Sequence, residues 1–364
     1  MGVLAKTFIV KKNDLKSGKF VESELAAKDG GAILQVDHFA LTANNITYAV
    51  AGDMMQYWNF FPAPEDGYGI VPVWGFGTVV DSKVEGLSFG DRFYGYFPFA
   101  SHVAVEPVRV SAGGFSDGAA HRQPMAAVYN NYTRTTADPL YDEKTEAEQM
   151  LLRPLFTTSF AIDDMLDDNG YFGAKAVILT SASSKTAYAA AYLLKKRKGV
   201  EVIGLTSRGN MMFVKRLGCY DRVVAYDDIA SLDAGVPVAV VDMAGNGNVR
   251  SSLHHHYGDN LKYDLGVGIT NWDAERGTPA DLPGAKPTMF FAPTQIAKRS
   301  KEWGAAVFGE KLAAAWHDFV AHASDPASPW FRVIRERRAS DVQKLYLETL
   351  AGKTPPMDGL ILSL

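Results

Sequence analysis

A short turn rich in hydroxyl groups is the first place where the sequence offers chemistry. Residues 180–187 read T-S-A-S-S-K-T-A, after the apolar run A-K-A-V-I-L and before the Ala-rich stretch Y-A-A-A-Y-L-L-K-K. A strand, a polar turn and a helix in this order often hold phosphate, because the first helix amides lack partners and the dipole is positive there. The predicted phosphate ligands are the turn's hydroxylated residues and its lysine: Ser181, Ser183, Ser184, Lys185 and Thr186.

The glycines that normally line such a turn are absent. In dinucleotide sites, glycines let the backbone approach the pyrophosphate and let the helix pack closely on the strand. Ser181, Ser184 and Ala187 keep the spacing of a Gly-x-x-Gly-x-x-Gly turn, and each is small enough to permit close approach. A capped helix start that binds nothing remains the alternative.

Two other motifs in this region are weaker. Ser184-Lys185-Thr186 is similar to the G-K-[ST] end of a nucleoside triphosphate loop, but the required glycines are missing. Tyr192 and Lys196 have the Y-x-x-x-K spacing of short-chain dehydrogenases, yet they lie on the helix after the first strand, which is the wrong element. We interpret both matches as coincidence.

The next strand helps to choose a cofactor. The segment V-I-G-L-T-S-R-G-N ends without the Asp or Glu that would bind a ribose 2′-hydroxyl. Ser207 and Arg208 stand there instead, and a guanidinium suits a 2′-phosphate. Unless Arg208 is simply a solvated turn residue, this pattern favours NADP(H) over NAD(H).

Hydrophobic periodicity divides the chain into segments with different secondary-structure patterns. The first 110 residues are β-rich, and residues 111–150 are polar and irregular, which predicts an inserted loop or a connecting segment. Beyond Leu151, short apolar strands alternate with helical patterns, which predicts crossover units and a parallel sheet. The final 35 residues again have the texture of the first part, so we expect the chain to return there. The candidate strands are 176–180, 201–206, 222–226, 238–242, 263–268 and 288–292.

Composition excludes several classes of function. A formal charge of −4 without a basic stripe or charged tail argues against nucleic-acid binding. The apolar runs are too short to span a bilayer, and the N-terminus lacks a signal-peptide pattern, so we expect a cytoplasmic protein with no membrane partner. The single cysteine, Cys219, excludes an internal disulfide and a multi-thiolate zinc site and is expected to be buried. We expect His254-His255-His256 to be a surface cluster, since consecutive helical residues cannot share one metal.

The order of these segments resembles the medium-chain dehydrogenase/reductases, in particular the zinc-independent quinone and enoyl reductase branch, as a divergent subgroup. The segment V-P-V-W-G-F-G-T-V-V-D-S-K-V-E-G-L-S-F-G-D-R-F-Y-G is similar to the family's Gly-rich strand and its V-x-x-F-x-x-G-D-R-V turn. A-V-I-L-T-S-A-S-S-K-T-A-Y-A-A-A corresponds to its strand, V-T-G-A-A-G-G-V-G turn and helix. R-P-L-F-T-T-S-F-A-I resembles the hinge helix with its L-T-A-Y pattern, and L-G-C-Y-D-R-V-V-A-Y-D-D resembles L-G-A-D-x-V-I-D-Y.

The resemblance implies an α/β fold with two domains. A GroES-like catalytic domain would comprise residues 1–140 and 328–364, and a Rossmann domain with a doubly wound parallel sheet would comprise residues 141–327. It also implies a cofactor between the domains and a homodimer formed through a Rossmann edge strand, for which M-F-F-A near residue 290 is the candidate. Trp74-Gly75 stands where zinc-using members carry His-Glu, so no catalytic metal is expected.

The resemblance also suggests residues for the chemistry. Asn45 falls near the family's N-P-x-D segment at the nicotinamide pocket, and the nearby Tyr48 is a phenol that can protonate a carbonyl oxygen, unless it only packs. Tyr132, in the inserted segment with Tyr129 and Asn130, is a second candidate proton donor. Thr158 corresponds to the threonine of L-T-A-Y and would either contact the cofactor or pack as a core threonine of its helix. Aromatic residues concentrated at 57–68 and 93–99 predict either a substrate cleft or core.

These observations lead to two hypotheses. The first is a zinc-independent, NADPH-dependent oxidoreductase that transfers hydride to an enone, quinone or other small carbonyl compound. The alternative is a non-redox enzyme, lyase-like or binding an acyl-coenzyme A, on the same fold with a degenerate dinucleotide site. Loss of the turn glycines favours the alternative, whereas Arg208 favours the first.

Overall fold

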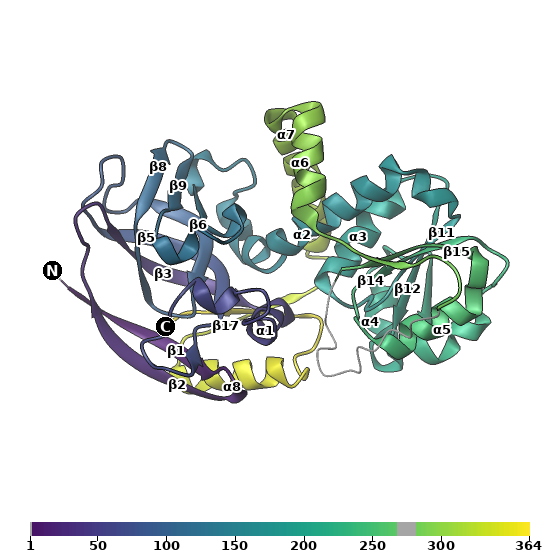
Figure 1. Cartoon of the computed structure of the whole chain (residues 1–364), viewed down its shortest axis with the longest axis horizontal. Coiled ribbons are helices and arrows are strands. Elements are labelled where there is room, and N and C mark those ends of the chain that lie inside the picture. The colour runs from purple at the N-terminus through teal and green to yellow at the C-terminus, as the bar shows by residue number, and fades with distance from the viewer. Residues whose placement is uncertain (1, 268–281) are drawn as a thin grey trace. The chain divides into compact units, whose positions relative to one another are not determined.

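The computed structural model describes residues 2–267 and 282–364, which form two compact units (Figure 1). The split unit contains residues 1–151 and 332–364, and the central unit contains residues 152–331. The sequence-based boundaries lay near residues 140 and 328. Helix α2 (Glu146–Asp168) runs through the first division as a single 23-residue helix, so no break in the helical pattern marks that division.

The split unit is built on a nine-stranded sheet. Eight strands follow the order β17-β18-β3-β5-β6-β10-β9-β8, and β7 pairs with β3 beside this path. The C-terminal strand β18 pairs antiparallel with β3, with Leu360 opposite Leu41, so the two ends of the chain meet in one sheet. The strands are β3 (Ala32–Leu41), β5 (Pro72–Ser82), β6 (Arg92–Pro98), β7 (His102–Val105), β8 (Pro107–Ser111), β9 (Gly114–Asp117), β10 (Asn131–Arg134), β17 (Arg332–Glu336) and β18 (Asp358–Leu362).

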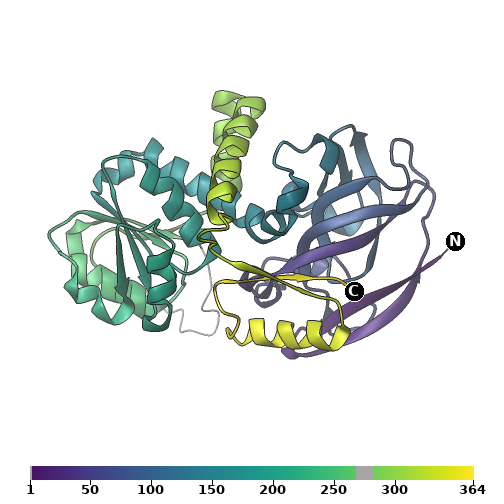
Figure 2. The same ribbon diagram turned by 180° about the vertical axis from the view of Figure 1, so that it is seen from behind.

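A three-stranded sheet and a C-terminal helix complete the core of this unit. Strands β1 (Val3–Lys11), β2 (Asp14–Leu25) and β4 (Tyr68–Gly69) pair in the order β2-β1-β4, and helix α8 (Ala339–Leu350) packs on β2 (Figure 2). The Tyr346 hydroxyl of α8 donates to the Leu15 carbonyl at 3.0 Å, and its ring meets that of buried Phe8 at 5.1 Å. Burying such aromatic side chains supplies most of the stabilisation of a core of this kind.

Short helices in the split unit carry residues that matter below. Helix α1 (Ala43–Val50) follows β3 directly, with Thr42 and Asn45 forming a reciprocal capping box. The 3₁₀ turns η1 (Tyr57–Asn59) and η3 (Ala127–Tyr129) bring aromatic residues from two different loops toward β5 and β6.

The central unit has a six-stranded parallel sheet flanked by helices, as predicted. Its order, β13-β12-β11-β14-β15-β16, places the first strand beside the fourth, which creates a topological switch point between β11 and β14. Its strands are β11 (Ala176–Leu179), β12 (Glu201–Thr206), β13 (Arg222–Ala225), β14 (Val238–Asp242), β15 (Leu261–Gly266) and β16 (Pro287–Met289). With α2, its helices are α3 (Lys185–Lys196), α4 (Met211–Arg216), α5 (Gly247–Tyr257), α6 (Ala292–Trp303) and α7 (Ala305–Ala323).

The apolar strands of this sheet are buried on both faces. Ala176 and Ile178 of β11, Val238 and Val240 of β14 and Leu253 of α5 belong to one core cluster, and each is at most 1% exposed. Continuous apolar runs are typical of parallel strands that helices cover on both sides, which explains why these strands were recognisable from sequence.

The structure corrects one expectation about this unit. His254 is not at the surface but completely buried: its Nε2 lies 2.8 Å from Oδ2 of Asp264, and its Nδ1 lies 2.8 Å from the Pro283 carbonyl. Only His255 of the triplet is fully exposed. Cys219 is buried, as expected, and burial raises the pKa of its thiol.

Candidate functional site

The turn after β11 keeps a glycine-like backbone without glycine. Ser181 has φ +49°, in the left-handed region that residues with a side chain rarely occupy. Its carbonyl accepts a 2.7 Å hydrogen bond from the Ser184 amide, which closes a tight turn into α3. The chain therefore makes the reversal that glycine normally permits.

Close packing of the turn depends on a glycine in the neighbouring strand. Ala182 is completely buried against Gly204 of β12. A Cβ atom at Gly204 would lie 2.9 Å from Cβ of Ala182 and 2.8 Å from the Tyr220 ring, which is too close. The small residue needed for this approach is thus supplied by β12 rather than by the turn.

The turn presents several hydrogen-bond donors at the start of α3. Ser184 caps the helix by accepting from the Ala187 amide at 3.3 Å, and Oγ of Ser183 accepts from Nδ2 of Asn210 at 3.1 Å. Each serine hydroxyl accepts in these bonds and can still donate its own proton. Among the described residues, the amides of Ser183 and Thr186 have no acceptor. These donors and the positive helix end suit a phosphate.

One donor of the turn is already used within the protein. The Ser181 amide donates to the hydroxyl of Tyr226, which follows β13, at 2.9 Å. Burial raises the pKa of Tyr226 to about 12, so its hydroxyl keeps its proton at neutral pH. At this edge of the sheet, the hydroxyl of Tyr226 can therefore donate a hydrogen bond in place of the Ser181 amide.

Buried polar groups join the strands on either side of the switch point. Oγ1 of Thr180 donates to Oδ1 of Asp242 at 2.6 Å and accepts from the Met243 and Ala244 amides at 2.9 and 3.0 Å. Burial raises the pKa of Asp242. The contact holds the carboxyl ends of β11 and β14 together beside the turn.

The predicted 2′-phosphate ligands lie after the next strand. Ser207 and Arg208 are exposed at the end of β12, which pairs with β11. The Arg208 guanidinium bonds Asp227 through Nε at 3.3 Å and Asp228 through Nη2 at 2.8 Å. A phosphate at this position would compete with two carboxylates for Arg208.

Thr158 lies on α2 and is half-buried, with Oγ1 3.5 Å from the Pro154 carbonyl. The next residue, Ser159, donates to the Thr186 carbonyl at 2.8 Å and so connects α2 to the start of α3. Tyr192 and Lys196, which resemble the short-chain dehydrogenase pair, both bind Asp318 of α7. Their contacts are those of a packed helix surface.

A second candidate site, in the split unit, is a tyrosine cluster, defined as Tyr48, Tyr57, Tyr96 and Tyr129 with Phe60 and Trp74. Ring centroids lie 4.7 Å apart for Tyr48 and Tyr57, 4.8 Å for Tyr96 and Tyr129, and 5.1 Å for Trp74 and Tyr96. The hydroxyls of Tyr57 and Tyr129 lie 3.3 Å apart. Aromatic residues from α1, η1, β5, β6 and η3 thus form one contiguous group.

Within the cluster, the Tyr48 hydroxyl accepts two hydrogen bonds. Nδ2 of Asn44 donates to it at 2.7 Å, and Nε1 of Trp74, which can only donate, lies at 3.2 Å. Burial, and next the nearby Tyr57, raise the pKa of Tyr48, and hydrogen bonds with Trp74, Asn44 and the Tyr129 hydroxyl work in the opposite direction. Tyr48 is therefore a neutral phenol with Tyr129 as a further hydroxyl neighbour.

The other two catalytic candidates have structural roles. Asn45 accepts from the Thr42 amide at 2.7 Å and donates to the Pro72 carbonyl at 2.9 Å, so it caps α1. Tyr132 is 1% exposed and donates to the Tyr96 carbonyl at 2.8 Å, and its ring lies where a Cβ atom at Gly95 would be only 2.5 Å away. Both side chains are buried and engaged in these hydrogen bonds, and their assignment as catalytic residues stays a prediction.

Arg122, which the sequence did not single out, organises the inserted segment. It is 1% exposed and donates to the Asp117 carboxylate at 2.8 Å, the Tyr132 hydroxyl at 3.1 Å and the Tyr129 carbonyl at 2.5 Å. Nε also donates to Asn130 at 3.0 Å, so Asn130 serves the same scaffold. This buried cation holds Tyr129 in the tyrosine cluster.

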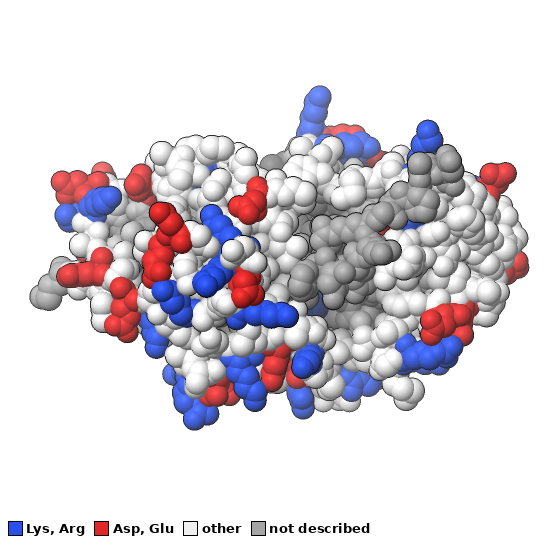
Figure 3. Space-filling view, turned by 60° about the horizontal axis from the view of Figure 1, so that its bottom comes forward, with Lys and Arg blue, Asp and Glu red and all other residues white. Residues whose placement is uncertain are grey.

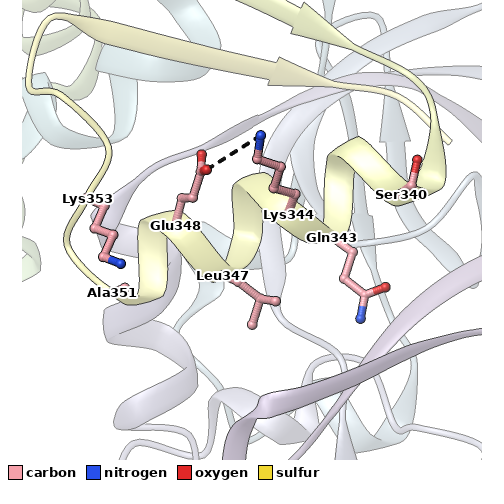
Figure 4. A pocket seen from close by; sticks show the side chains of 7 residues that line it. All are labelled: Ser340, Gln343, Lys344, Leu347, Glu348, Ala351 and Lys353. Atoms are coloured by element: carbon pink, nitrogen blue, oxygen red, sulfur yellow. Dashed lines mark ion pairs between the residues drawn. The ribbon is translucent and has the colours of Figure 1, made fainter.

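Other surfaces carry little functional signal. Acidic and basic side chains are intermixed on the face in Figure 3. A shallow pocket of about 420 Å³ lies along α8, where Lys344 and Glu348 form a 3.9 Å ion pair (Figure 4). No predicted site residue lines it. Within residues 2–267 and 282–364, no helix is long and apolar enough to cross a membrane, and no group of three or more His, Cys, Asp or Glu could hold a metal.

Comparison with solved structures identifies the fold. The chain is similar to CurA from Vibrio vulnificus in complex with NADPH (TM-score 0.62, 13% identity, 98% of each chain covered). It is also similar to a quinone oxidoreductase from Coxiella burnetii (0.56, 14%, 100% of each chain) and to the YhdH oxidoreductase from Salmonella enterica in complex with NADP (0.53, 14%, 99% of each chain). These likenesses extend over the whole chain and confirm the predicted pairing of a GroES-like domain with a Rossmann domain.

Sequence comparison adds a family without adding an activity. No curated protein matches the chain in sequence. One family model, described as protein of unknown function (DUF2855), matches residues 39–355, which include the tyrosine cluster and the serine turn. With most of its length matched, this chain is a member of the DUF2855 family, and its fold is that of the reductase structures above.

Proposed function

We propose that the protein is an NADPH-dependent, zinc-independent oxidoreductase that reduces an enone, quinone or other small carbonyl compound. The observation that carries the proposal is the left-handed turn at Ser181, which leads into α3 beside the switch point of a parallel sheet. NADPH and NADP complexes of structurally similar proteins support the choice of cofactor.

The residues at the turn fit a dinucleotide. Hydroxyls of Ser183 and Ser184 and the amides of Ser183 and Thr186 would bind the pyrophosphate, with the charge of Lys185 beside them. Ser207 and Arg208 would bind the 2′-phosphate after exchanging the aspartate partners of Arg208. Thr158, on the helix beside the turn, would contact the nicotinamide end. When bound, NADPH supplies a hydride.

Tyr48 would act as the proton donor. Its phenol is neutral, and the N–H groups of Asn44 and Trp74 would stabilise the phenolate that remains after the proton leaves. No metal enters the proposal, because Trp74 and Gly75, where zinc-using relatives carry ligands, have no side-chain atom that binds zinc.

Cofactor titration tests the proposal. We expect the fluorescence of NADPH to change on binding, and we expect Arg208→Ala to weaken NADPH by about tenfold or more, because a charged hydrogen bond is worth about 1.5–3 kcal/mol. The same substitution should change the affinity for NADH little, because NADH lacks the 2′-phosphate. An equal loss for both nucleotides would refute the role of Arg208, and no binding at millimolar NADPH would refute the redox assignment.

One observation favours a second candidate, a non-redox enzyme that binds coenzyme A or another phosphate-bearing ligand. The Ser181 amide is already bonded to Tyr226, and Arg208 is held by two carboxylates, so the site differs from a glycine-lined one. A thermal-shift comparison separates the candidates: stabilisation by coenzyme A without stabilisation by NADPH or NADH supports the second.

A further inference from the structure

The hydrogen bonds around Tyr48 restrict what the tyrosine cluster can bind. A phenol oxygen accepts up to two hydrogen bonds and donates one. Asn44 at 2.7 Å and Trp74 at 3.2 Å donate to Tyr48, so its accepting capacity is occupied. The Tyr129 hydroxyl also interacts with Tyr48, so a ligand oxygen that accepts the Tyr48 proton would take the place of this neighbour.

The surroundings of Tyr48 contain a second buried donor. Tyr96 is completely buried, and its hydroxyl has no hydrogen-bond partner in the part of the chain that the structure describes. Its ring centroid lies 5.5 Å from that of Tyr48. A buried hydroxyl without a partner costs about 1–3 kcal/mol, which a ligand oxygen could recover.

Solvent reaches only part of the cluster. Asn44, Trp74 and Tyr129 are only partly buried, whereas Tyr48, Tyr57 and Phe60 are at most 8% exposed. Flat, conjugated rings pack well against such aromatic faces, with centroids about 4.5–7 Å apart. No carboxylate belongs to this group, so a ligand that carries negative charge meets no repulsion from the cluster itself.

We propose that Asn44 and Trp74 are positioning residues that make Tyr48 an obligatory donor, and that the cluster binds a planar conjugated compound through an oxygen bearing negative charge. This inference rests on the proposed function, because a carbonyl oxygen gains such charge when the compound is reduced. It specifies the substrate class as a quinone or an aryl-conjugated carbonyl compound, rather than an aliphatic one.

Binding of 4-nitrophenol, measured without any nucleotide, tests this inference. Its absorbance distinguishes the phenol from the phenolate, so a titration of the bound probe against pH reports which form the site prefers. We expect the wild-type protein to favour the phenolate relative to free solution. Tyr48→Phe should abolish this preference. Trp74→Phe and Asn44→Ala should each reduce it about two- to tenfold, the value of one hydrogen bond.

A matched control lies outside the cluster. Tyr346→Phe on α8 removes a buried tyrosine hydroxyl that bonds the Leu15 carbonyl and no member of the cluster, so it should leave the phenolate preference intact. Asn44 is only partly buried, so Asn44→Ala provides a test even where Tyr48→Phe impairs folding. Combining Trp74→Phe with Tyr48→Phe should add no loss, because Trp74 acts through Tyr48.

Each remaining outcome counts against the inference. Binding of the neutral phenol, an unchanged preference in both Trp74→Phe and Asn44→Ala, or no binding of the probe would overturn it. None of these results bears on the serine turn, because no nucleotide is present. Conversely, the protein could show the expected phenolate preference and yet bind no NADPH. That pair of results would remove the redox assignment and leave the cluster as a binding site.

Discussion

At the residue scale, the two candidate sites depend on side chains that replace backbone groups. Ser181 occupies a left-handed conformation that costs a residue with a side chain about 1–2 kcal/mol. The Ser181 amide donates a hydrogen bond to the Tyr226 hydroxyl, so that hydroxyl rather than the amide can donate to a ligand. The Arg208 guanidinium is hydrogen-bonded to Asp227 and Asp228. Phenol, hydroxyl and guanidinium groups thus surround this turn, where a dinucleotide-binding turn normally presents glycine amides.

The aspartates beside Arg208 should weaken NADPH binding. Asp228→Asn removes the 2.8 Å ion pair and one negative charge near the 2′-phosphate. Because exposed ion pairs are worth about 0–1 kcal/mol, we expect NADPH to bind about two- to fivefold more tightly. The gain should shrink in high salt and be absent for NADH. Isothermal titration at two salt concentrations measures both effects, and weaker NADPH binding would contradict the placement of the 2′-phosphate.

At the element scale, buried and half-buried charges tie strands to helices. In the split unit, Glu146 at the start of α2 bonds His38 of β3 and Arg92 of β6, together with the Tyr141 hydroxyl. Burial works to raise the pKa of Glu146, but these hydrogen bonds and the Arg92 charge outweigh burial and lower the pKa to about 2. In the central unit, His254 and Arg250 of α5 hydrogen-bond the carboxylate of Asp264 and so connect this helix to β15.

Glu146 predicts a loss of stability in acid. A carboxylate whose pKa is lower in the folded state stabilises the fold above its unfolded pKa, about 4.3, and loses that contribution as pH falls toward about 2. Urea unfolding should therefore show stability falling from pH 5 to pH 2. Glu146→Gln should be less stable than the wild type at pH 7 and lose less over that interval. An identical pH dependence of the two proteins would disprove this assignment.

At the scale of the whole molecule, the parallel sheet ends in an exposed strand. All three residues of β16 are exposed, and Met289 and Phe291 present apolar side chains at 78% and 59% exposure. Within the described residues β16 has no strand on its outer side, and an edge of this kind can pair with a second chain, as the homodimer implied by the family resemblance would require.

Light scattering after size-exclusion chromatography tests this edge. We expect a dimer for the wild type and a monomer or a concentration-dependent mixture for Met289→Lys, because a charge on an edge strand opposes pairing. Val307→Lys, an exposed apolar position on α7, is the matched control and should leave the mass unchanged. A monomeric wild-type protein would exclude the dimer.

Local pattern was enough to predict the parallel sheet and the return of the C-terminal segment, whereas the GroES-like domain was expected from the family resemblance. The six strands of the central unit, the helix after the serine turn and the return of the C-terminal segment all followed from apolar runs and their spacing, because backbone pairing and burial impose those periods on any sequence. The serine turn was also identifiable, because its residues are contiguous.

Tertiary structure decided which of the candidate residues meet. Tyr48, Trp74 and Tyr129 are separated by up to 81 positions, and only the register of β5 with β6 and the anchoring of η3 by Arg122 bring them together. The burial of His254, the capture of the Ser181 amide by Tyr226, and the structural roles of Asn45 and Tyr132 have the same origin. A side chain's hydrogen-bond partners depend on which strands become neighbours, and spacing along the chain does not contain that information.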